Sequence, residues 1–343
     1  MQQIATKSFS ILLLCTAVAL IGATVHCAPG GNNASVKYDI TVANDGTGTF
    51  KTVQEAFNAI PEHSQKAIVV FIRNGVYKEK LVLSASRTNV HLIGENADSV
   101  VLTYDDHSGR KVGEDTLNTY NCYSTSIESD DFTAENITFE NNAGFTAGQS
   151  VALQILGDRI KLVHCRLVGF QDVFFTKGTG RCYVSDSYIE GTTDFIFGAS
   201  ILVLNKCTIV SKKKSHVTAA STPQGNKFGY VLMGCTLKAT DGIQDVSLGR
   251  PWRPYAQVVY IGCEIGGHIG ATGWNNFHDP EKEKTAYFAE YQCTGPGADR
   301  SGRLAWTHVL TPEEATRYTL KNIFSAGSAV KPFAADWDPL TTP

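Results

Sequence analysis

Short stretches of alternating apolar and polar residues recur along the chain, and each is followed by a turn. Each begins at a small or polar residue. The clearest are NVHLIGE (89–95), NITFEN (136–141), HCRLVGF (164–170), DSYIEGT (186–192), KCTIVSK (206–212), GCTLKAT (234–240) and GCEIGGH (262–268). Alternation of this kind, with β-branched residues and glycine punctuation, indicates short β-strands.

These stretches share one register. Cys165, Ser187, Cys207, Cys235 and Cys263 occupy the same position in it, at steps of 22, 20, 28 and 28 residues. A unit this short cannot bury its apolar face alone, so successive units must stack. Because few helical patterns separate the stretches, we expect an all-β fold of the parallel β-helix type.

Stacking would place like side chains in ladders. Neighbouring rungs about 4.8 Å apart lie within reach of a disulfide, so Cys207–Cys235 or Cys235–Cys263 could form one. Cys165 and Cys207 lie two rungs apart and should not. We favour the alternative in which the thiols are buried, free and packed as small hydrophobic side chains.

Two helical patterns lie near the ends of the repeat region. In KTVQEAFNAI (51–60), Val53, Ala56, Phe57 and Ile60 have helical spacing. TPEEATRYTLKNIF (311–324) begins with the signature of a capping box. We therefore expect short capping helices at the two ends of the stack. No linker rich in Pro, Gly or Ser divides residues 28–343, so we expect a single domain there.

The first 27 residues are typical of a signal peptide. Lys7 precedes the uncharged run ILLLCTAVALIGATV (11–25), which is short for a membrane span. Small residues follow, which predicts cleavage between Ala23 and Ala28. An N-terminal anchor helix is the alternative. We expect a secreted, extracellular protein with no membrane association after cleavage.

Composition and charge exclude several classes of protein. The chain is 43% hydrophobic and 18% charged, as ordered globular proteins are. The formal net charge of -3 gives no basic excess for binding nucleic acid. No CxxC pair indicates zinc, and the absence of GxSxG argues against an ordinary serine esterase.

Polar side chains interrupt the apolar stretches at a few places. They are Gln149 in GQSVALQ (148–154), Gln171 and Asp172 in GFQDVFF (169–175), Asp194 in GTTDFIFG (191–198), and Arg250 and Trp252 in LGRPW (248–252). Asp172 and Asp194 are 22 residues apart, about one coil, so both should lie on one face. Two carboxylates that close favour one protonated acid and one ionised base. Arg250 could hold the ionised member.

Structural explanations remain open on spacing alone. Aspartate ladders in solenoids can cap turns or bind calcium, and Gln149 and Gln171 could satisfy backbone groups. Trp252 alone is more often a packing residue, although beside Arg250 it could form a sugar platform.

Five motifs taken together resemble a known family. GVYKEK (75–80), GQSVALQ, GFQDVFF, GTTDFIFG and LGRPW, in this order and spacing, resemble the pectin methylesterases. The likeness runs from DGTGTFKTVQEAF (45–57) to FAEYQCTGPGA (288–298). It implies a right-handed parallel β-helix, no metal or organic cofactor, and methyl-esterified pectin as substrate, with methanol released. Because no inhibitory pro-region precedes the catalytic part, we expect a monomer closer to the short bacterial members.

The resemblance also implies a role for each motif residue. Asp194 would be the nucleophile and Asp172 the general acid and base. Gln149 and Gln171 would donate to the oxyanion, Arg250 would orient Asp194, and Trp252 would stack on the sugar. Further contacts with the substrate are expected from Ser124, Phe170, Phe195, Tyr255 and Trp274. Phe170 and Thr193 depart from the usual Tyr and Val of the family.

Other functions stay possible at this point. A polygalacturonate lyase or hydrolase could use the same architecture, but the Gln, Asp and Arg set fits ester chemistry better. A catalytically inactive carbohydrate-binding solenoid would be expected to lack a carboxylate or the arginine. A related esterase could act on another ester.

Overall fold

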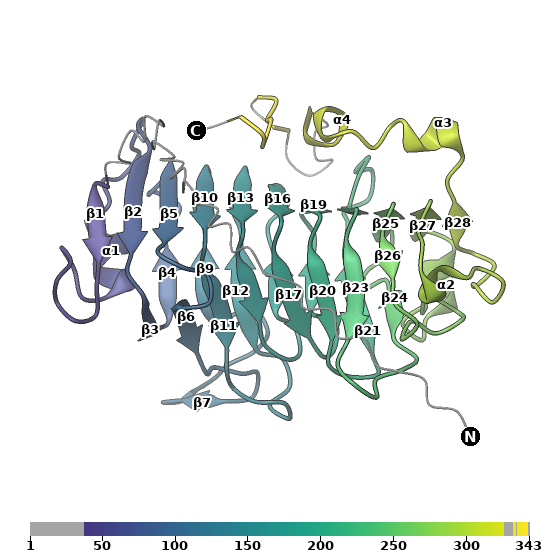
Figure 1. Ribbon diagram of the computed structural model, residues 1–343, viewed down its shortest axis with the longest axis horizontal. Coiled ribbons are helices and arrows are strands. Elements are labelled where there is room, and N and C mark those ends of the chain that lie inside the picture. Colours follow the sequence, from purple (N-terminus) through teal and green to yellow (C-terminus); the bar gives the residue numbers. More distant parts are fainter. Residues whose placement is uncertain (1–37, 326–331, 334, 342–343) are drawn as a thin grey trace, which may run out of the picture. The chain divides into compact units, whose positions relative to one another are not determined.

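The computed structural model describes residues 38–325, 332–333 and 335–341. The predicted signal peptide, residues 1–27, lies outside these ranges. The described chain visits three parallel sheets in turn, coil after coil, so that strands far apart in sequence lie side by side (Figure 1). This is the expected parallel β-helix, and it is right-handed, as connections between parallel strands of one sheet nearly always are.

The strands of each sheet follow the order of the coils. Sheet A contains β1 (Ile40–Val42), β2 (Ile68–Ile72), β5 (Val90–Gly94), β10 (Phe132–Glu135), β13 (Ile160–Val163), β16 (Arg181–Ser185), β19 (Ile201–Asn205), β22 (Tyr230–Met233), β25 (Gln257–Ile261), β27 (Tyr287–Tyr291) and β28 (His308–Val309). Sheet B contains β3 (Gly75–Lys78), β6 (Val100–Tyr104), β11 (Thr138–Asn141), β14 (Arg166–Val168), β17 (Tyr188–Gly191), β20 (Thr208–Ser211), β23 (Thr236–Ala239) and β26 (Glu264–Ile265). Sheet C contains β4 (Leu81–Leu83), β9 (Tyr123–Ile127), β12 (Val151–Ile155), β15 (Phe174–Thr176), β18 (Ile196–Gly198), β21 (His216–Ala220) and β24 (Ser247–Gly249). A separate antiparallel pair is formed by β7 (Lys111–Val112) and β8 (Asp115–Thr116).

Inward-facing side chains of the three sheets fill the interior of the coils. In β13, Ile160 and Leu162 are fully buried, whereas the alternate Lys161 is only partly buried. Ile160 pairs with Cys182 on the next coil, so like positions stack along the fold. Each large apolar side chain buried in this way contributes about 1.5–3 kcal/mol.

The cysteine register predicted from the sequence is present, and the thiols are free. All seven cysteines in the described part of the chain lack a disulfide. Ser187 occupies the rung between Cys165 and Cys207, where its hydroxyl oxygen accepts a hydrogen bond from the Cys165 amide at 3.0 Å. The ladder is therefore a packing feature of the core, as favoured from the sequence.

Helix α1 (Val53–Ala59) covers the first end of the stack, as predicted. Thr52 and Glu55 form a capping box at its start. The carboxylate of Glu79, in the GVYKEK motif, accepts hydrogen bonds from the amides of Val53 and Gln54 at 2.9 and 3.0 Å. These bonds satisfy two amides that have no partner within the helix, while Phe57 is buried in the core.

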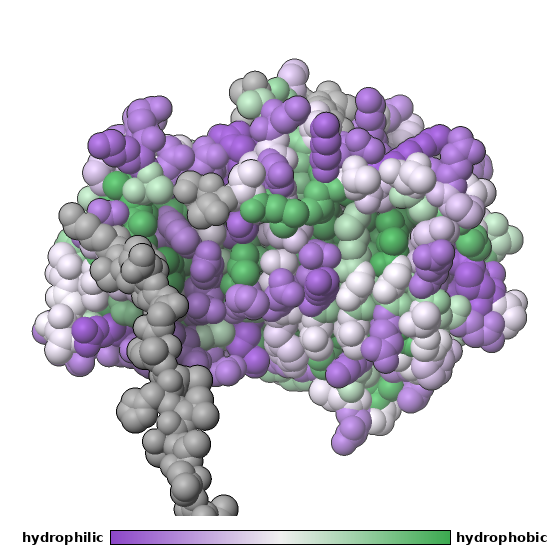
Figure 2. All heavy atoms as spheres, turned by 45° about the horizontal axis from the view of Figure 1, so that its top comes forward, coloured by the Kyte–Doolittle hydropathy of each residue, from purple (hydrophilic) through white to green (hydrophobic). Residues whose placement is uncertain are grey.

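The second expected cap is wrong in its position. Thr311 caps α3 (Pro312–Ala315) as predicted, but α4 (Leu320–Ser325) packs on the outer face of sheet A (Figure 1). Its Ile323 and Phe324 lie against the outward-facing Tyr183 and Val203. Apolar residues on that outer face require a cover, and the helix provides it, whereas Figure 2 shows many hydrophilic residues on the surrounding surface.

A loop rather than a helix packs near the last coil. Leu304 and Trp306 lie against the core there, and the Trp306 ring is 5.5 Å from that of Phe288. The remaining short helices are α2 (Pro280–Glu283) and the 3-10 turn η1 (Pro296–Ala298). Within residues 38–325 and the short segments that follow, no helix has the length and hydrophobicity to cross a membrane.

Candidate active site

A small cleft lies where sheet C begins, and it gathers most of the residues singled out in the sequence. Its volume is about 180 Å³. Its lining consists of Thr119, Gln149, Gln171, Asp172, Asp194, Phe197, Ala219, Arg250, Trp252 and Phe277. Six of the side chains predicted from motifs thus share one cavity.

The two aspartates occupy equivalent positions on adjacent coils. Phe174 pairs with Ile196 between β15 and β18, and each aspartate precedes its strand by two residues. The amide of Asp172 donates to the carbonyl of Thr193 at 3.0 Å, which continues the register into the turn. Both residues have left-handed backbone conformations, with φ of 65° and 50°, which aspartate tolerates better than most residues. The step of 22 residues therefore places two carboxylates on one face.

Arg250 binds the second carboxylate in a fork. Its Nε donates to Asp194 Oδ1 at 2.9 Å, and its Nη2 donates to Oδ2 at 2.6 Å. Asp194 is only 8% exposed and would be costly to bury as an unpaired charge. The bidentate ion pair offsets that cost and fixes the direction of the carboxylate.

The surroundings push both carboxyl pKa values upward, but to different extents. Burial raises the pKa of Asp172 well above its ordinary value, and the charge of Asp194 adds to this, against weaker opposition from Gln171 and Arg250. Burial also raises the pKa of Asp194, while the hydrogen bonds and charge of Arg250 oppose the rise. Because only Asp194 holds the arginine, Asp172 is the more readily protonated member of the pair.

Amide groups stand beside the carboxylates. Gln149 and Gln171 face each other on adjacent coils through an isolated parallel bridge. The Gln171 side chain hydrogen-bonds Asp172. The Gln149 amide forms no side-chain hydrogen bond with the residues that the structure describes, so it remains available as a donor to a bound molecule.

Aromatic rings form one wall of the cleft. Trp252 meets Phe197 edge to face at 5.7 Å and Phe175 at 6.1 Å, and these two phenylalanines stack at 4.2 Å. Phe277 lies 4.1 Å from the guanidinium carbon of Arg250. Phe197 and Phe277 were not predicted from the sequence. Strand alternation after Asp194 could have found Phe197, but no pattern points to Phe277, which follows the irregular GWNN segment.

Three of the predicted substrate contacts are wrong, because the side chains are buried. Ser124 is fully buried in β9, where its hydroxyl donates to the Tyr104 carbonyl. Phe195 is fully buried and packs inward in the core, and Trp274 is 2% exposed, with its indole nitrogen donating to Glu290 at 3.2 Å. A polysaccharide cannot reach such groups without opening the core.

The other two predicted contacts are partly exposed but do not line the cleft. Phe170 directly precedes Gln171, and its ring lies 4.3 Å from the ammonium of Lys212. Tyr255 has a left-handed backbone with φ of 65°, and its amide donates to Thr285. Both remain predictions as substrate contacts.

A histidine on the next coil was also missed. The amide of Asp194 donates to the carbonyl of His216, whose ring lies 2.6 Å from the Ser247 hydroxyl. Burial and the nearby cations Arg250 and His278 lower the pKa of His216 to about 4. The ring is therefore neutral at physiological pH and adds no charge beside Arg250.

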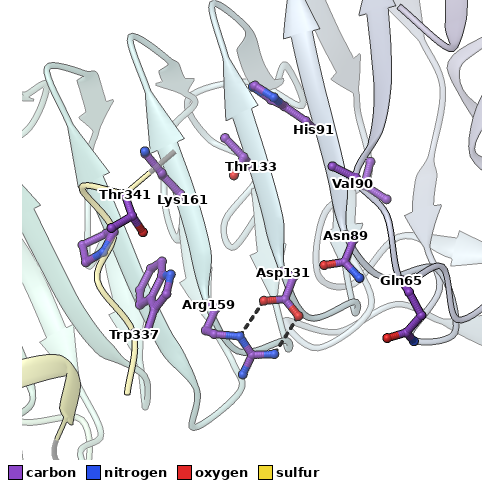
Figure 3. Close-up of a pocket in the computed structure, with 12 residues that line it drawn as sticks. Gln65, Asn89, Val90, His91, Asp131, Thr133, Arg159, Lys161, Trp337 and Thr341 are labelled. Atoms are coloured by element: carbon purple, nitrogen blue, oxygen red, sulfur yellow. Dashed lines mark hydrogen bonds and ion pairs between the residues drawn. The ribbon is translucent and has the colours of Figure 1, made fainter. Parts of the chain in front are cut away.

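A larger cavity, of about 330 Å³, opens on the outer face of sheet A (Figure 3). There Asp131 is held by a fork from Arg159, and Trp337 and Lys161 lie farther along the groove. The cavity contains one paired carboxylate and no second acid beside it. It therefore lacks the acid and base arrangement of the smaller cleft, which we take as the candidate active site.

Comparisons with known proteins agree with this choice of chemistry. The family model described as Pectinesterase matches residues 39–327. A probable pectinesterase/pectinesterase inhibitor of Brassica napus is 35% identical over 308 residues, which cover 85% of this chain and 52% of that protein. Pectinesterase 31 of Arabidopsis thaliana is 33% identical over 81% of this chain and 90% of its own length. The chain thus spans about half the length of the Brassica relative but most of the Arabidopsis one.

Solved structures with the same fold come from a plant and a bacterium. Pectin methylesterase from carrot superposes with a TM-score of 0.80 at 32% identity, covering 89% of this chain and 99% of that one. Pectin methylesterase PemA from Erwinia chrysanthemi gives a TM-score of 0.78 at 27% identity, covering 90% and 100%.

Proposed function

The chain belongs to the pectinesterase family, and on that basis we propose that it hydrolyses the methyl esters of galacturonate units in pectin, releasing methanol. The observation that carries this proposal is the pair of buried carboxylates on adjacent coils, of which only Asp194 is held by Arg250. A pair with such unequal environments supplies one ionised nucleophile and one protonated acid.

Asp194 is the proposed nucleophile. Its carboxylate attacks the C6 carbonyl of the ester and forms a tetrahedral intermediate whose oxyanion needs donors. The amides of Gln149 and Gln171, which line the same cleft, are suited to that role. Arg250 keeps the attacking oxygen ionised and fixed in direction.

Asp172 is the proposed acid and base. Its raised pKa keeps a proton available, and that proton passes to the departing methoxide, which leaves as methanol. An acyl-enzyme on Asp194 remains. The ionised Asp172 then takes a proton from water, the hydroxide attacks the acyl carbon, and galacturonate leaves. Asp194 is released as a carboxylate, and Asp172 holds a proton again.

Three finer expectations belong to the same proposal. The sequence of residues 1–27 supports secretion to the extracellular space, where pectin is found, and we propose a monomer. For the subgroup, the likeness expected to short bacterial members stays a prediction. The identities of 32% to the carrot enzyme and 27% to the Erwinia enzyme do not favour it.

The test is methanol release from highly methylated pectin, measured beside the chain length of the polymer. The proposal predicts methanol without chain shortening and without unsaturated products. Asp194→Ala should abolish release while the circular dichroism spectrum is retained. Asp186→Ala, which changes an exposed aspartate with the same φ of 50°, serves as the matched control. Full activity in the Asp194 variant, or shortened chains with the native protein, would overturn the proposal.

A further inference from the structure

Cationic side chains gather around two aromatic rings on the wall of the cleft. The guanidinium carbon of Arg253 lies 5.3 Å from the ring centre of Trp252. Phe277 lies between two cations, with Arg250 at 4.1 Å and the ammonium of Lys282 at 4.3 Å from its ring centre. Because Trp252 and Phe277 both line the cleft, the cations stand at its edge.

The cations in this cluster outnumber the nearby acids. Asp194 neutralises Arg250. Arg253 forms no ion pair with any residue that the structure describes, and Lys282 has only Asp279 near it, with Nζ and Oδ2 at 3.9 Å. Burial lowers the pKa of Lys282, and repulsion from Arg253 and Arg250 adds to the effect despite Asp279. At least one positive charge beside the cleft therefore lacks a counterion, in a protein whose formal net charge is -3.

We propose that Arg253 and Lys282 form a subsite for the free carboxylate of an unesterified galacturonate unit, next to the unit whose ester is cleaved. This inference rests on the proposed function. A methyl ester is neutral and cannot balance the cluster, whereas a carboxylate can accept charge-assisted hydrogen bonds from both side chains. The two rings offer apolar faces to the sugar itself.

The side chains suit a binding site better than a solvated surface. Only 13% of the Lys282 side chain is exposed, so little water screens its interaction with an anion in the cleft. Arg253 is exposed and has the reach and planar fork that carboxylates favour. The residues that follow Phe277 begin α2, whose Pro280 lies at its start, so Lys282 is held on an ordered element.

A consequence for the reaction follows from this subsite. Each turnover converts a neutral ester into a carboxylate, so the product of one cleavage becomes a preferred neighbour for the next. The enzyme should then act faster on ester groups beside free acids than on ester groups in fully esterified runs. Demethylation should proceed in runs along the polymer rather than at scattered positions.

The experiment compares two substrates, highly esterified homogalacturonan and the same polymer partly de-esterified with base. The measured quantity is the ratio of kcat/KM, per ester, for the second polymer over the first. The native enzyme should give a ratio above one. Lys282→Met should lower the ratio about tenfold and Arg253→Gln about threefold, as expected for a partly buried and an exposed charge. Lys282→Arg should retain it.

A matched control and an independent binding readout separate the outcomes. Lys284→Met removes an exposed cation two residues away that pairs with Glu281, and it should leave the ratio unchanged. Unesterified oligogalacturonate should inhibit the native enzyme competitively, with an inhibition constant about tenfold higher in the Lys282→Met variant. Methanol release with equal ratios in native and variant enzymes would overturn the subsite alone. No methanol from either polymer would instead overturn the proposed function.

Discussion

The proposed acid should reduce the stability of the fold that carries it. Asp172 is 6% exposed and has no basic side chain bonded to it, and burial raises its pKa well above the ordinary value. Asp172→Asn keeps the shape of the side chain and tolerates the left-handed φ of 65°. We expect this variant to lose methanol release and to become more stable at neutral pH.

The sign follows from proton linkage. With a raised folded-state pKa, native Asp172 keeps its proton at pH values where the unfolded chain, with an ordinary pKa of about 3.9, has released it. Its contribution to stability is therefore complete below about pH 4 and is lost as pH rises. Relative to native protein, the variant should gain about 1.4 kcal/mol per pH unit above that point, until the folded-state pKa is reached.

The size of the total gain can be bounded. Replacing buried charges by neutral groups of similar volume stabilises proteins by about 1–4 kcal/mol. One kcal/mol shifts the melting temperature of a domain of 150–250 residues by about 2–4 °C, so a rise of at least about 2 °C is expected for this chain. The pH at which the gain levels off would measure the pKa of Asp172 in the folded protein.

Urea unfolding of both proteins at intervals between pH 4 and pH 8 measures this difference. Asp186→Asn is the control, because the exposed Asp186 has a left-handed φ of 50° but lies outside the cleft. It should change stability by less than about 0.5 kcal/mol at every pH. A constant difference between Asp172→Asn and native protein across this range would refute the raised pKa. A loss of stability that grows with pH would refute the sign.

Three further substitutions test the ion pairs and the cover of sheet A. Arg250→Lys keeps the charge but loses the fork on Asp194, so kcat/KM should fall about 10–100-fold and the acidic limb of its pH profile should move to higher pH, because less opposes the rise in the Asp194 pKa; an unchanged profile would contradict this role. Phe324→Ala should cost about 3–4 kcal/mol in urea unfolding, since the ring is fully buried against the outside of sheet A, while KM for pectin stays unchanged; a cost below about 1 kcal/mol would show that α4 is not a required cover. Glu290→Gln leaves the buried Arg303 without its carboxylate and should cost about 3–5 kcal/mol; wild-type stability in the variant would mean that water already screens this pair.

The stacking of the coils could be predicted because its physical constraint is written in the spacing. Parallel pairing fixes one strand beside the next, so side chains that must face the interior recur once per coil. The step from Asp172 to Asp194 carried that register into the cleft, as the pairing of Phe174 with Ile196 shows. Arg250 lies 56 residues beyond Asp194, and only the family motif connected them, because coil lengths vary.

The facing of individual side chains was harder to predict. Phe195 is fully buried in the core and Phe197 lines the cleft, although both follow Asp194 in one short apolar run. The strand begins only at Ile196, and the turn before it breaks the alternation from which facing is read. Trp274 was misplaced for a related reason, since its polar nitrogen finds its partner, Glu290, inside the fold. A polar tip on a large side chain does not show whether that partner is a ligand or a buried residue.

The same backbone position supports both structural and proposed catalytic aspartates. Asp186 and Asp194 each precede a β-strand with a φ of 50°, a conformation in which aspartate is a common turn residue. Asp186 is exposed, and its carboxylate remains in water. Asp194 faces a cleft closed by Phe197, Phe277 and Trp252, where the field of Arg250 is poorly screened. The turn explains why aspartate is tolerated at both positions, and the aromatic wall with its arginine explains why only one of them is suited to attack an ester. A change that opens that wall, leaving both turns intact, should therefore weaken the reaction without weakening the fold.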